Sequence, residues 1–296
     1  MVARSAQGAG IRTLTPHASA SNLHPAAGVE RGDPGVNSIC GKDEWVERPH
    51  SRRIESGVNR VPVNAGSIAA RWEDLQDRVA SVCARIDRDP AGIRIVAVSK
   101  QHPATLVHEA IAAGITHFGE NRVQEAQAKI ALVTPRPVWH LVGHLQTNKA
   151  KVAAGLFDWV HSVDSAKVAL ALGSGAGQAG RVLEVLVQVN TTGEAQKSGC
   201  SPEELEGVIE AVLGRPGLAL RGLMTIGPES QDETRTRRAF EEAARCADLW
   251  RARLGGGEMD MLSMGMSDDW PWALEYGANM IRVGTALFGP RSKGQA

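Results

Sequence analysis

The chain has 296 residues, enough for one large domain or two small ones, and its 43% hydrophobic content is typical of a globular protein. Its 33 basic and 33 acidic residues balance to zero net charge, which argues against a broad nucleic-acid or membrane surface but not against a local phosphate site. Four cysteines without a CxxC pair indicate reduced thiols of a cytoplasmic protein rather than a disulfide framework or a zinc site.

Residues 1–65 differ from the rest of the chain. They are rich in Gly, Pro, Ser, Asn and Arg and show no lasting periodicity, so we expect a disordered extension there and one domain over residues 66–296. Nowhere does an apolar run approach the roughly 18–20 residues of a membrane-spanning helix.

From Ser67, a suitable helix N-cap, short apolar runs alternate with amphipathic stretches. Strands are predicted at 94–100, 115–119, 137–143, 158–163, 182–190, 219–226, 259–264 and 280–284. Helices are predicted at 103–113, 121–133, 146–155, 165–172, 202–213, 231–253 and 268–277, after a first helix that ends near Ile86. This alternation predicts a closed parallel (β/α)8 TIM barrel. The alternative, an open doubly wound sheet, usually has a Gly-rich first turn, and the first turn here has no glycine.

Lys100 ends the first predicted strand, Arg94-Ile95-Val96-Ala97-Val98-Ser99-Lys100. It alternates with Val96 and Val98, so in a barrel it shares their inward face. A partly desolvated lysine there would supply a neutral, nucleophilic amine. The other interpretation is an ordinary lysine that extends its amine to solvent at a strand end.

The loops after the seventh and eighth strands are suited to phosphate. Ser263, Gly265, Gly284 and Thr285 bring small residues and hydroxyls to the two loops that often bind phosphate in such barrels. The alternative for Gly284 is relief of crowding at a barrel corner.

Arg282 lies in an otherwise apolar strand, and a buried arginine needs a partner. A carboxylate such as Glu184 or Asp260 is one candidate, and a hydrogen-bond acceptor on a ligand is the other. Three histidines, His140, His144 and His161, raise the question of a metal site. The chain has no HExxH motif and no carboxylate cluster, so we expect strand-end histidines with hydrogen-bond partners and no metal.

Several segments resemble, in order and at matching spacing, the pyridoxal phosphate homeostasis protein family (YggS/PROSC-like), which is related to the alanine racemase N-terminal domain. The resemblance runs from about Ser67 to Arg291. The segments are Val96-Ala97-Val98-Ser99-Lys100, Phe118-Gly119-Glu120-Asn121, Trp139-His140-Leu141-Val142-Gly143-His144-Leu145-Gln146-Thr147-Asn148-Lys149, Lys197-Ser198-Gly199, Gly222-Leu223-Met224, Leu262-Ser263-Met264-Gly265-Met266-Ser267 and Arg282-Val283-Gly284-Thr285-Ala286.

The resemblance implies pyridoxal 5′-phosphate as cofactor and a role for each matching position. Lys100 corresponds to the lysine that forms a Schiff base with the cofactor, and Arg282 to the arginine that faces the pyridine nitrogen. The phosphate ligands correspond to Ser263, Gly284 and Thr285. Asn121 and Met224 would flank the ring.

An arginine at the pyridine nitrogen bears on the chemistry. Guanidinium only donates hydrogen bonds, so it holds that nitrogen unprotonated and makes the ring a weaker electron sink than a carboxylate partner would. Alanine racemase adds a tyrosine base from a C-terminal domain. This chain ends at Ala296, where we expect no such domain, and its one tyrosine, Tyr276, precedes the eighth strand.

We therefore expect a cytoplasmic protein of pyridoxal phosphate homeostasis that binds, buffers and delivers the cofactor and has no catalytic residues of its own. Its partners would be the cofactor and pyridoxal phosphate-dependent apo-enzymes, and we expect a monomer. One alternative is a pyridoxal phosphate-dependent amino-acid racemase. Another is a cofactor-free aldolase that uses Lys100 with Glu120 or His161 as acid or base, which would leave Arg282 without a role.

Overall fold

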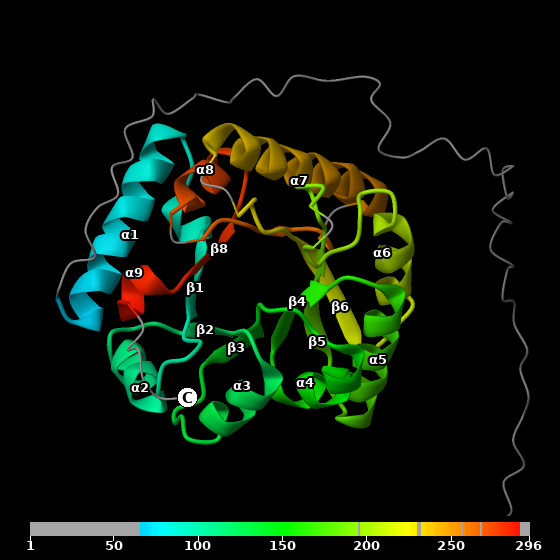
Figure 1. Cartoon of the computed structure of the whole chain (residues 1–296), viewed down its shortest axis with the longest axis horizontal. Coiled ribbons are helices and arrows are strands. Elements are labelled where there is room, and N and C mark those ends of the chain that lie inside the picture. Colours follow the sequence, from blue (N-terminus) through cyan, green and yellow to red (C-terminus); the bar gives the residue numbers. More distant parts are fainter. Residues whose placement is uncertain (1–65, 195, 230–231, 256, 267, 291–296) are drawn as a thin grey trace, which may run out of the picture. The chain divides into compact units, whose positions relative to one another are not determined.

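The structure is a computed structural model that describes residues 66–290 except 195, 230–231, 256 and 267. Eight parallel strands pair in sequence order, and the eighth closes on the first (Figure 1). The predicted (β/α)8 TIM barrel is confirmed, whereas the extension expected at 1–65 lies outside the described residues. The strands are β1 (Arg94–Val98), β2 (His117–Glu120), β3 (Val138–Leu141), β4 (Trp159–Val163), β5 (Leu183–Gln188), β6 (Leu218–Met224), β7 (Met261–Ser263) and β8 (Met280–Val283).

The helices form a ring outside the barrel, and α1 packs against α2, α8 and α9 beside β1 and β8 (Figure 1). Within the described part, no helix has the length and apolar character needed to cross a membrane. The helices are α1 (Ile68–Arg85), α2 (Ala104–Ala112), α3 (Val123–Ile130), α4 (Ala150–Leu156), α5 (Ala166–Gln178), α6 (Leu205–Leu213), α7 (Glu233–Leu254), α8 (Trp270–Glu275) and α9 (Thr285–Phe288), with short 3₁₀ turns η1 (Pro90–Gly92) and η2 (Thr147–Lys149).

All eight predicted strands exist, but most end earlier than the apolar pattern does. β1 ends at Val98. One further ladder bond follows, from the Ser99 N–H to the Gly119 carbonyl at 3.0 Å. Gln101 then has a positive φ of 61°, which turns the chain away from the barrel. These early strand ends leave the next residues free to form the loops at the carboxyl end.

Two helices differ from the prediction. α5 continues to Gln178, past the expected end at 172, because its glycines allow close packing against α4. A Cβ on Gly175 would lie 2.8 Å from the Lys151 Cα, so this contact outweighs the poor helix propensity of glycine. The short α9, which follows Gly284, was not expected.

The barrel has two separate cores. The larger one fills the space between strands and helices. The smaller one lies inside the barrel, and its buried apolar members are Val96, Val98, Val142, Leu186, Met224 and Met280. Because these few apolar side chains do not fill the interior, polar side chains from the remaining inward positions complete it.

Gly222 is the tightest backbone contact between neighbouring strands. Its φ is 147°, and a Cβ there would lie 1.8 Å from the Met261 carbonyl oxygen of β7. We expect Gly222→Ala to lower the free energy of unfolding by about 3 kcal/mol or more, through backbone strain and overlap with β7. Chemical denaturation measures this loss.

Gly207→Ala in α6 is the matched control, because a methyl group added at this position would have no neighbouring atom within 4 Å. It should stabilise the protein by about 0.5–1 kcal/mol through helix propensity. Equal effects of the two substitutions would contradict the assignment of Gly222.

Candidate functional site

Lys100 follows the inward-facing residues of β1. Val96 and Val98 both belong to the interior core, so the alternation that the sequence predicted is the one that β1 adopts. Lys100 is partly buried and lies one residue beyond the Ser99–Gly119 ladder bond. The lysine therefore stands at the carboxyl end of the barrel, where the strand passes into its loop.

A cluster of charged groups holds the backbone on both sides of Lys100. The Lys129 Nζ donates to the Ser99 carbonyl at 2.7 Å, and the Ser99 hydroxyl donates to Glu120 Oε1 at 2.7 Å. On the other side, the Gln101 N–H donates to the Glu125 carboxylate. Both peptide groups next to Lys100 are thus fixed by side chains of α3, and Glu120 of β2 fixes the Ser99 hydroxyl.

Glu120 and Lys129 form a buried ion pair with Oε1 and Nζ 2.6 Å apart, and their side chains are 0% and 6% exposed. Burial raises the pKa of Glu120, and the attraction of Lys129 opposes this rise. Sequence reasoning missed Lys129. The available signal was its position at i+3 and i+6 from Ala126 and Val123, a lysine on the buried face of α3.

Arg282 is the buried charge of the barrel interior, with 4% exposure. Its Nη1 donates to the Ser263 hydroxyl at 2.7 Å and its Nη2 to the Thr225 carbonyl at 2.9 Å. Burial lowers its pKa to about 10, against a smaller opposing effect of the more distant Asp269. Among the described residues, no carboxylate forms an ion pair or hydrogen bond with this guanidinium.

The carboxylate partners considered for Arg282 do not reach it. Glu184 instead forms an ion pair with Arg221 of β6. Asp260 is exposed before β7, and its backbone carbonyl accepts a hydrogen bond from Asn279. Among the described residues, Arg282 therefore donates only to neutral groups, and its charge has no ion-pair partner there.

The histidines do not gather round a common point. His140 and His161 are fully buried and share a nitrogen-to-nitrogen hydrogen bond of 2.9 Å, whereas His144 is 53% exposed and pairs with Asp164 at 3.3 Å. The described residues contain no group of three ligands suited to a metal ion.

The remaining predicted site residues surround the same barrel end. Met224, at the end of β6, is fully buried in the interior core and pairs in register with Ser263. Asn121 directly follows β2, and a Cβ on Gly143 would lie 2.3 Å from its carbonyl oxygen, so the loop after β3 packs closely against it.

Gly284 and Thr285 follow β8 at the edge next to β1. A Cβ on Gly284 would lie 3.2 Å from the Val98 carbonyl oxygen, so this close approach confirms crowding at that corner. Thr285 is exposed. The two residues thus offer a tight backbone turn and an accessible hydroxyl beside the strand that leads to Lys100.

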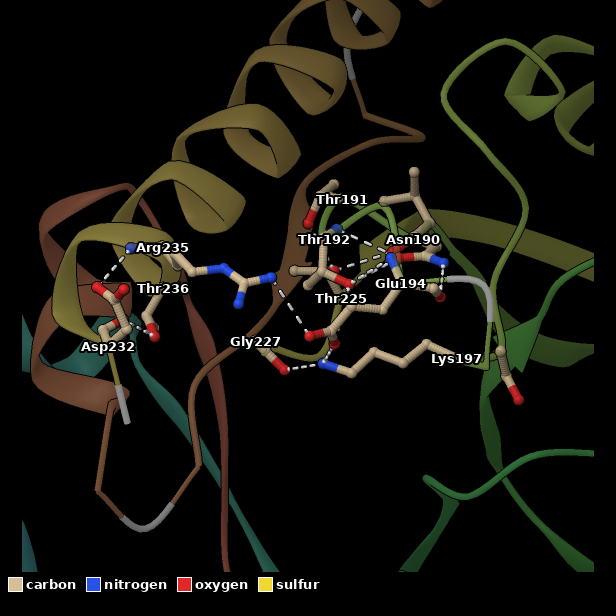
Figure 2. A network of polar contacts seen from close by, with 12 residues as sticks. Asn190, Thr191, Thr192, Glu194, Lys197, Thr225, Gly227, Asp232, Arg235 and Thr236 are labelled. Atoms are coloured by element: carbon tan, nitrogen blue, oxygen red, sulfur yellow. Dashed lines mark hydrogen bonds and ion pairs between the residues drawn. The ribbon is translucent and has the colours of Figure 1, made fainter. Parts of the chain in front are cut away.

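A polar network ties together the loops after β5 and β6 (Figure 2). Glu194 forms ion pairs with Lys197 at 2.8 Å and with Arg235 at 3.5 Å. Lys197 also donates a hydrogen bond to the Gly227 carbonyl at 2.5 Å. The Thr225 hydroxyl lies 3.0 Å from that of Thr191 in the loop after β5, and the Thr225 carbonyl accepts a hydrogen bond from Arg282. Contacts between these two loops therefore include the residue that holds the buried guanidinium.

The family model for the alanine racemase N-terminal domain matches residues 71–292. The pyridoxal phosphate homeostasis protein of Pseudomonas aeruginosa is 44% identical over 229 residues, which cover 74% of this chain and 97% of the relative.

Two solved structures of PipY from Synechococcus elongatus match with TM-scores of 0.69 without pyridoxal phosphate and 0.67 with it bound. They are 41% and 40% identical and cover 75% of this chain and 100% of PipY. Alanine racemase from Bacillus anthracis is similar in fold alone, at 17% identity and a TM-score of 0.55, over 75% of this chain and 57% of the racemase. The chain therefore belongs to the alanine racemase N-terminal domain family and, within it, to the pyridoxal phosphate homeostasis proteins.

Proposed function

We propose that this protein binds pyridoxal 5′-phosphate at the carboxyl end of its barrel and serves in cofactor homeostasis, holding the reactive aldehyde and delivering it to other proteins. The observation that carries this proposal is Arg282, a buried guanidinium whose hydrogen-bond partners among the described residues are neutral. A pyridine nitrogen is an acceptor of matching chemistry. The pyridoxal phosphate-bound structure of PipY, at 40% identity, supports the same ligand.

The residues at the carboxyl end fit the cofactor. Lys100 supplies the amine that bonds to the aldehyde, and Asn121 and Met224 flank the ring. Gly284 and Thr285 would hold the phosphate, and at Gly284 the 3.2 Å approach of the Val98 carbonyl oxygen to an added Cβ disfavours a larger residue. The sequence also predicts Ser263 as a phosphate ligand, and in the structure its hydroxyl contacts Arg282 and His161.

When bound, pyridoxal phosphate supplies an electrophilic aldehyde and an electron-withdrawing ring. Arg282 donates to the ring nitrogen and keeps it unprotonated, which weakens that withdrawal. Tyr276 ends α8 before β8 begins, so it lies at the amino end of the barrel, opposite Lys100. This protein therefore has no tyrosine base at the proposed site within its described residues.

The alternatives receive less support. The racemases among the similar structures share only the fold, at 16–17% identity. For an aldolase, the acid or base would be Glu120 or His161. Glu120 is fully buried and its Oε1 is bonded to Lys129 and Ser99, and both nitrogens of the fully buried His161 are hydrogen-bonded, so neither side chain is exposed to a substrate.

We propose that the protein works in the cytoplasm, as a monomer that hands the cofactor to pyridoxal phosphate-dependent apo-enzymes. The thiols of Cys83 and Cys200 are buried and unbridged, which suits a reducing compartment. Light scattering with and without an apo-enzyme measures the monomer and its complex.

Replacing Lys100 should abolish the covalent bond to the cofactor. We expect wild-type protein mixed with pyridoxal phosphate to show a visible absorbance band, and borohydride followed by peptide mass spectrometry to find a pyridoxyl group on Lys100. Lys100→Ala should show neither. Lys151→Ala, on the exposed side of α4, is the control and should behave like wild type. An adduct confined to another lysine would contradict the assignment.

A second prediction concerns turnover. Enzymes typically turn over about 1–1000 times per second. Because the site lacks a second proton-transferring group among the described residues, purified protein saturated with pyridoxal phosphate should racemise alanine far more slowly than about 1 per second. Chiral chromatography of the product measures this rate. A rate within the usual enzyme range would establish the racemase alternative.

Lys129 should be essential for holding the backbone that carries Lys100 in place. Removing one member of a buried ion pair leaves the other charge uncompensated, so Lys129→Met should cost about 3–5 kcal/mol of unfolding free energy. It should also slow the reaction of Lys100 with pyridoxal phosphate, because the Ser99 carbonyl loses its donor. Denaturation and stopped-flow absorbance measure the two effects.

The exposed Lys151→Met is the matched control, with an expected change within about 0.5 kcal/mol. If Lys129→Met were as stable and as reactive as this control, the role of the ion pair would be refuted.

A further inference from the structure

A continuous chain of hydrogen bonds runs through the barrel interior and ends at Arg282. His117 Nδ1 lies 2.9 Å from His140 Nε2, and His140 Nδ1 lies 2.9 Å from His161 Nε2. His161 Nδ1 lies 3.2 Å from the Ser263 hydroxyl oxygen, which accepts from Arg282 Nη1 at 2.7 Å. Five side chains from β2, β3, β4, β7 and β8 are thus linked, and this imidazole chain has no part in the function argued above.

Only one direction of hydrogen-bond donation along the imidazole chain gives every buried donor an acceptor. In each nitrogen-to-nitrogen bond one atom must donate and the other accept, so a neutral imidazole inside the chain carries one proton. The hydroxyl hydrogen of Ser263 has one acceptor among the described residues, His161 Nδ1. If His161 donated instead, this hydrogen would be buried without a partner. We therefore assign the direction from the hydrogen-bond network, with Ser263 as first donor.

This direction determines all three tautomers. His161 accepts at Nδ1 and donates from Nε2 to His140, which donates from its Nε2 to His117. The last donor, His117 Nε2, is at the one end of the chain that is partly exposed. His117 also lines a cavity of about 610 Å³ at the amino ends of the strands, together with Arg94, Thr116 and Asn279. Solvent in this cavity can accept the hydrogen bond of its Nε2–H.

Charged groups at both ends favour the neutral form. Burial lowers the pKa of His140 and His161 well below the usual value; His161, His117 and Arg94 lower that of His140 further, and Arg282 and Arg94 that of His161. Burial and Arg94 also lower the pKa of His117 to about 4, against a smaller opposing effect of Asp158. A second proton on any inner imidazole would place two N–H groups face to face.

We propose that His161, held by His140 and His117, is a positioning residue: its Nδ1 accepts the hydrogen bond of the Ser263 hydroxyl, so that Ser263 presents only lone pairs to Arg282 and fixes the guanidinium for the ligand. This inference rests on the proposed function for the identity of that ligand. The Thr225 carbonyl fixes the other side of the guanidinium, at Nη2. Between these two acceptors the remaining N–H groups of Arg282 have a defined direction before any ligand arrives.

The tautomers can be tested in the wild-type protein without cofactor. Long-range ¹H–¹⁵N spectra of ¹⁵N-histidine-labelled protein, recorded from pH 5.5 to 8.5, distinguish the two neutral tautomers and the protonated form. We expect His117, His140 and His161 as neutral Nε2–H tautomers at every pH. An Nδ1–H tautomer or a second proton on His161 or His140 would overturn the proposal.

The effect on Arg282 can be tested with His161→Leu. In this variant the guanidinium N–H signals of Arg282 should broaden or exchange at least about threefold faster with water, because Ser263 can rotate. The affinity for pyridoxal phosphate should fall about 3–10-fold, the effect of one typical hydrogen bond. The visible absorbance of the bound cofactor should become pH-dependent, since its ring nitrogen is no longer held by a fixed donor.

Three further variants separate positioning from general damage. Val160→Ala removes buried volume from the residue that precedes His161 in β4, whose side chain lies on the helix side of the strand. It should leave the Arg282 signals and the cofactor spectrum unchanged. His140→Leu touches neither Ser263 nor Arg282 yet should change both readouts in the direction of His161→Leu. His161→Gln, with both an acceptor and a donor, should restore them in part and serves if the leucine variant does not fold.

The outcomes also distinguish this inference from the proposed function. If pyridoxal phosphate does not bind but the Arg282 signals respond to His161→Leu, the cofactor assignment fails and the positioning stands. If the cofactor binds and Arg282 responds equally to His161→Leu and Val160→Ala, the positioning fails and the cofactor assignment stands.

Discussion

The interior of this barrel is organised around one buried positive charge. A guanidinium with 4% exposure has lost most of its hydration, and the two groups that accept its hydrogen bonds, on Ser263 and Thr225, are neutral. The other inward positions nearby are then constrained, since an acid would neutralise the charge and a bulky apolar residue would deprive it of acceptors. The neutral histidines of β3 and β4 satisfy this constraint, because each offers an acceptor without carrying charge.

A buried ion pair lies on the outer side of the sheet. Glu120 and Lys129 compensate each other, and Lys129 extends to the Ser99 carbonyl, so the pair fixes the backbone that carries Lys100. The backbone next to Lys100 and the guanidinium of Arg282 are thus held from opposite sides of adjacent strands, β1 and β8. Such preorganisation suits a protein that must bind an aldehyde cofactor well while leaving its chemistry unused.

The sequence was most informative where a residue contradicted its local pattern. Lys100 at the end of an apolar strand and Arg282 within another indicated the interior of the barrel and predicted a site at its carboxyl end. Lys129 contradicted its pattern as well, since it lies on the buried face of α3. It was missed because a lysine in a short polar helix usually extends to solvent. The partners of Arg282 were beyond prediction, because Ser263 lies on β7 and Thr225 just after β6, and only the pairing and register of these strands place them beside β8.

The sequence alone determined the number and order of the strands, the barrel and the family, because hydrophobic alternation and motif order are properties of the chain itself. Only the tertiary structure decided the contacts between strands. Whether a histidine binds a metal, a substrate or another histidine depends on which side chains face it across the barrel, and the 2.9 Å bond between His140 and His161 joins residues of neighbouring strands. The length of α5 was decided in the same way, since close packing on α4 overrode the helix-breaking tendency of its glycines.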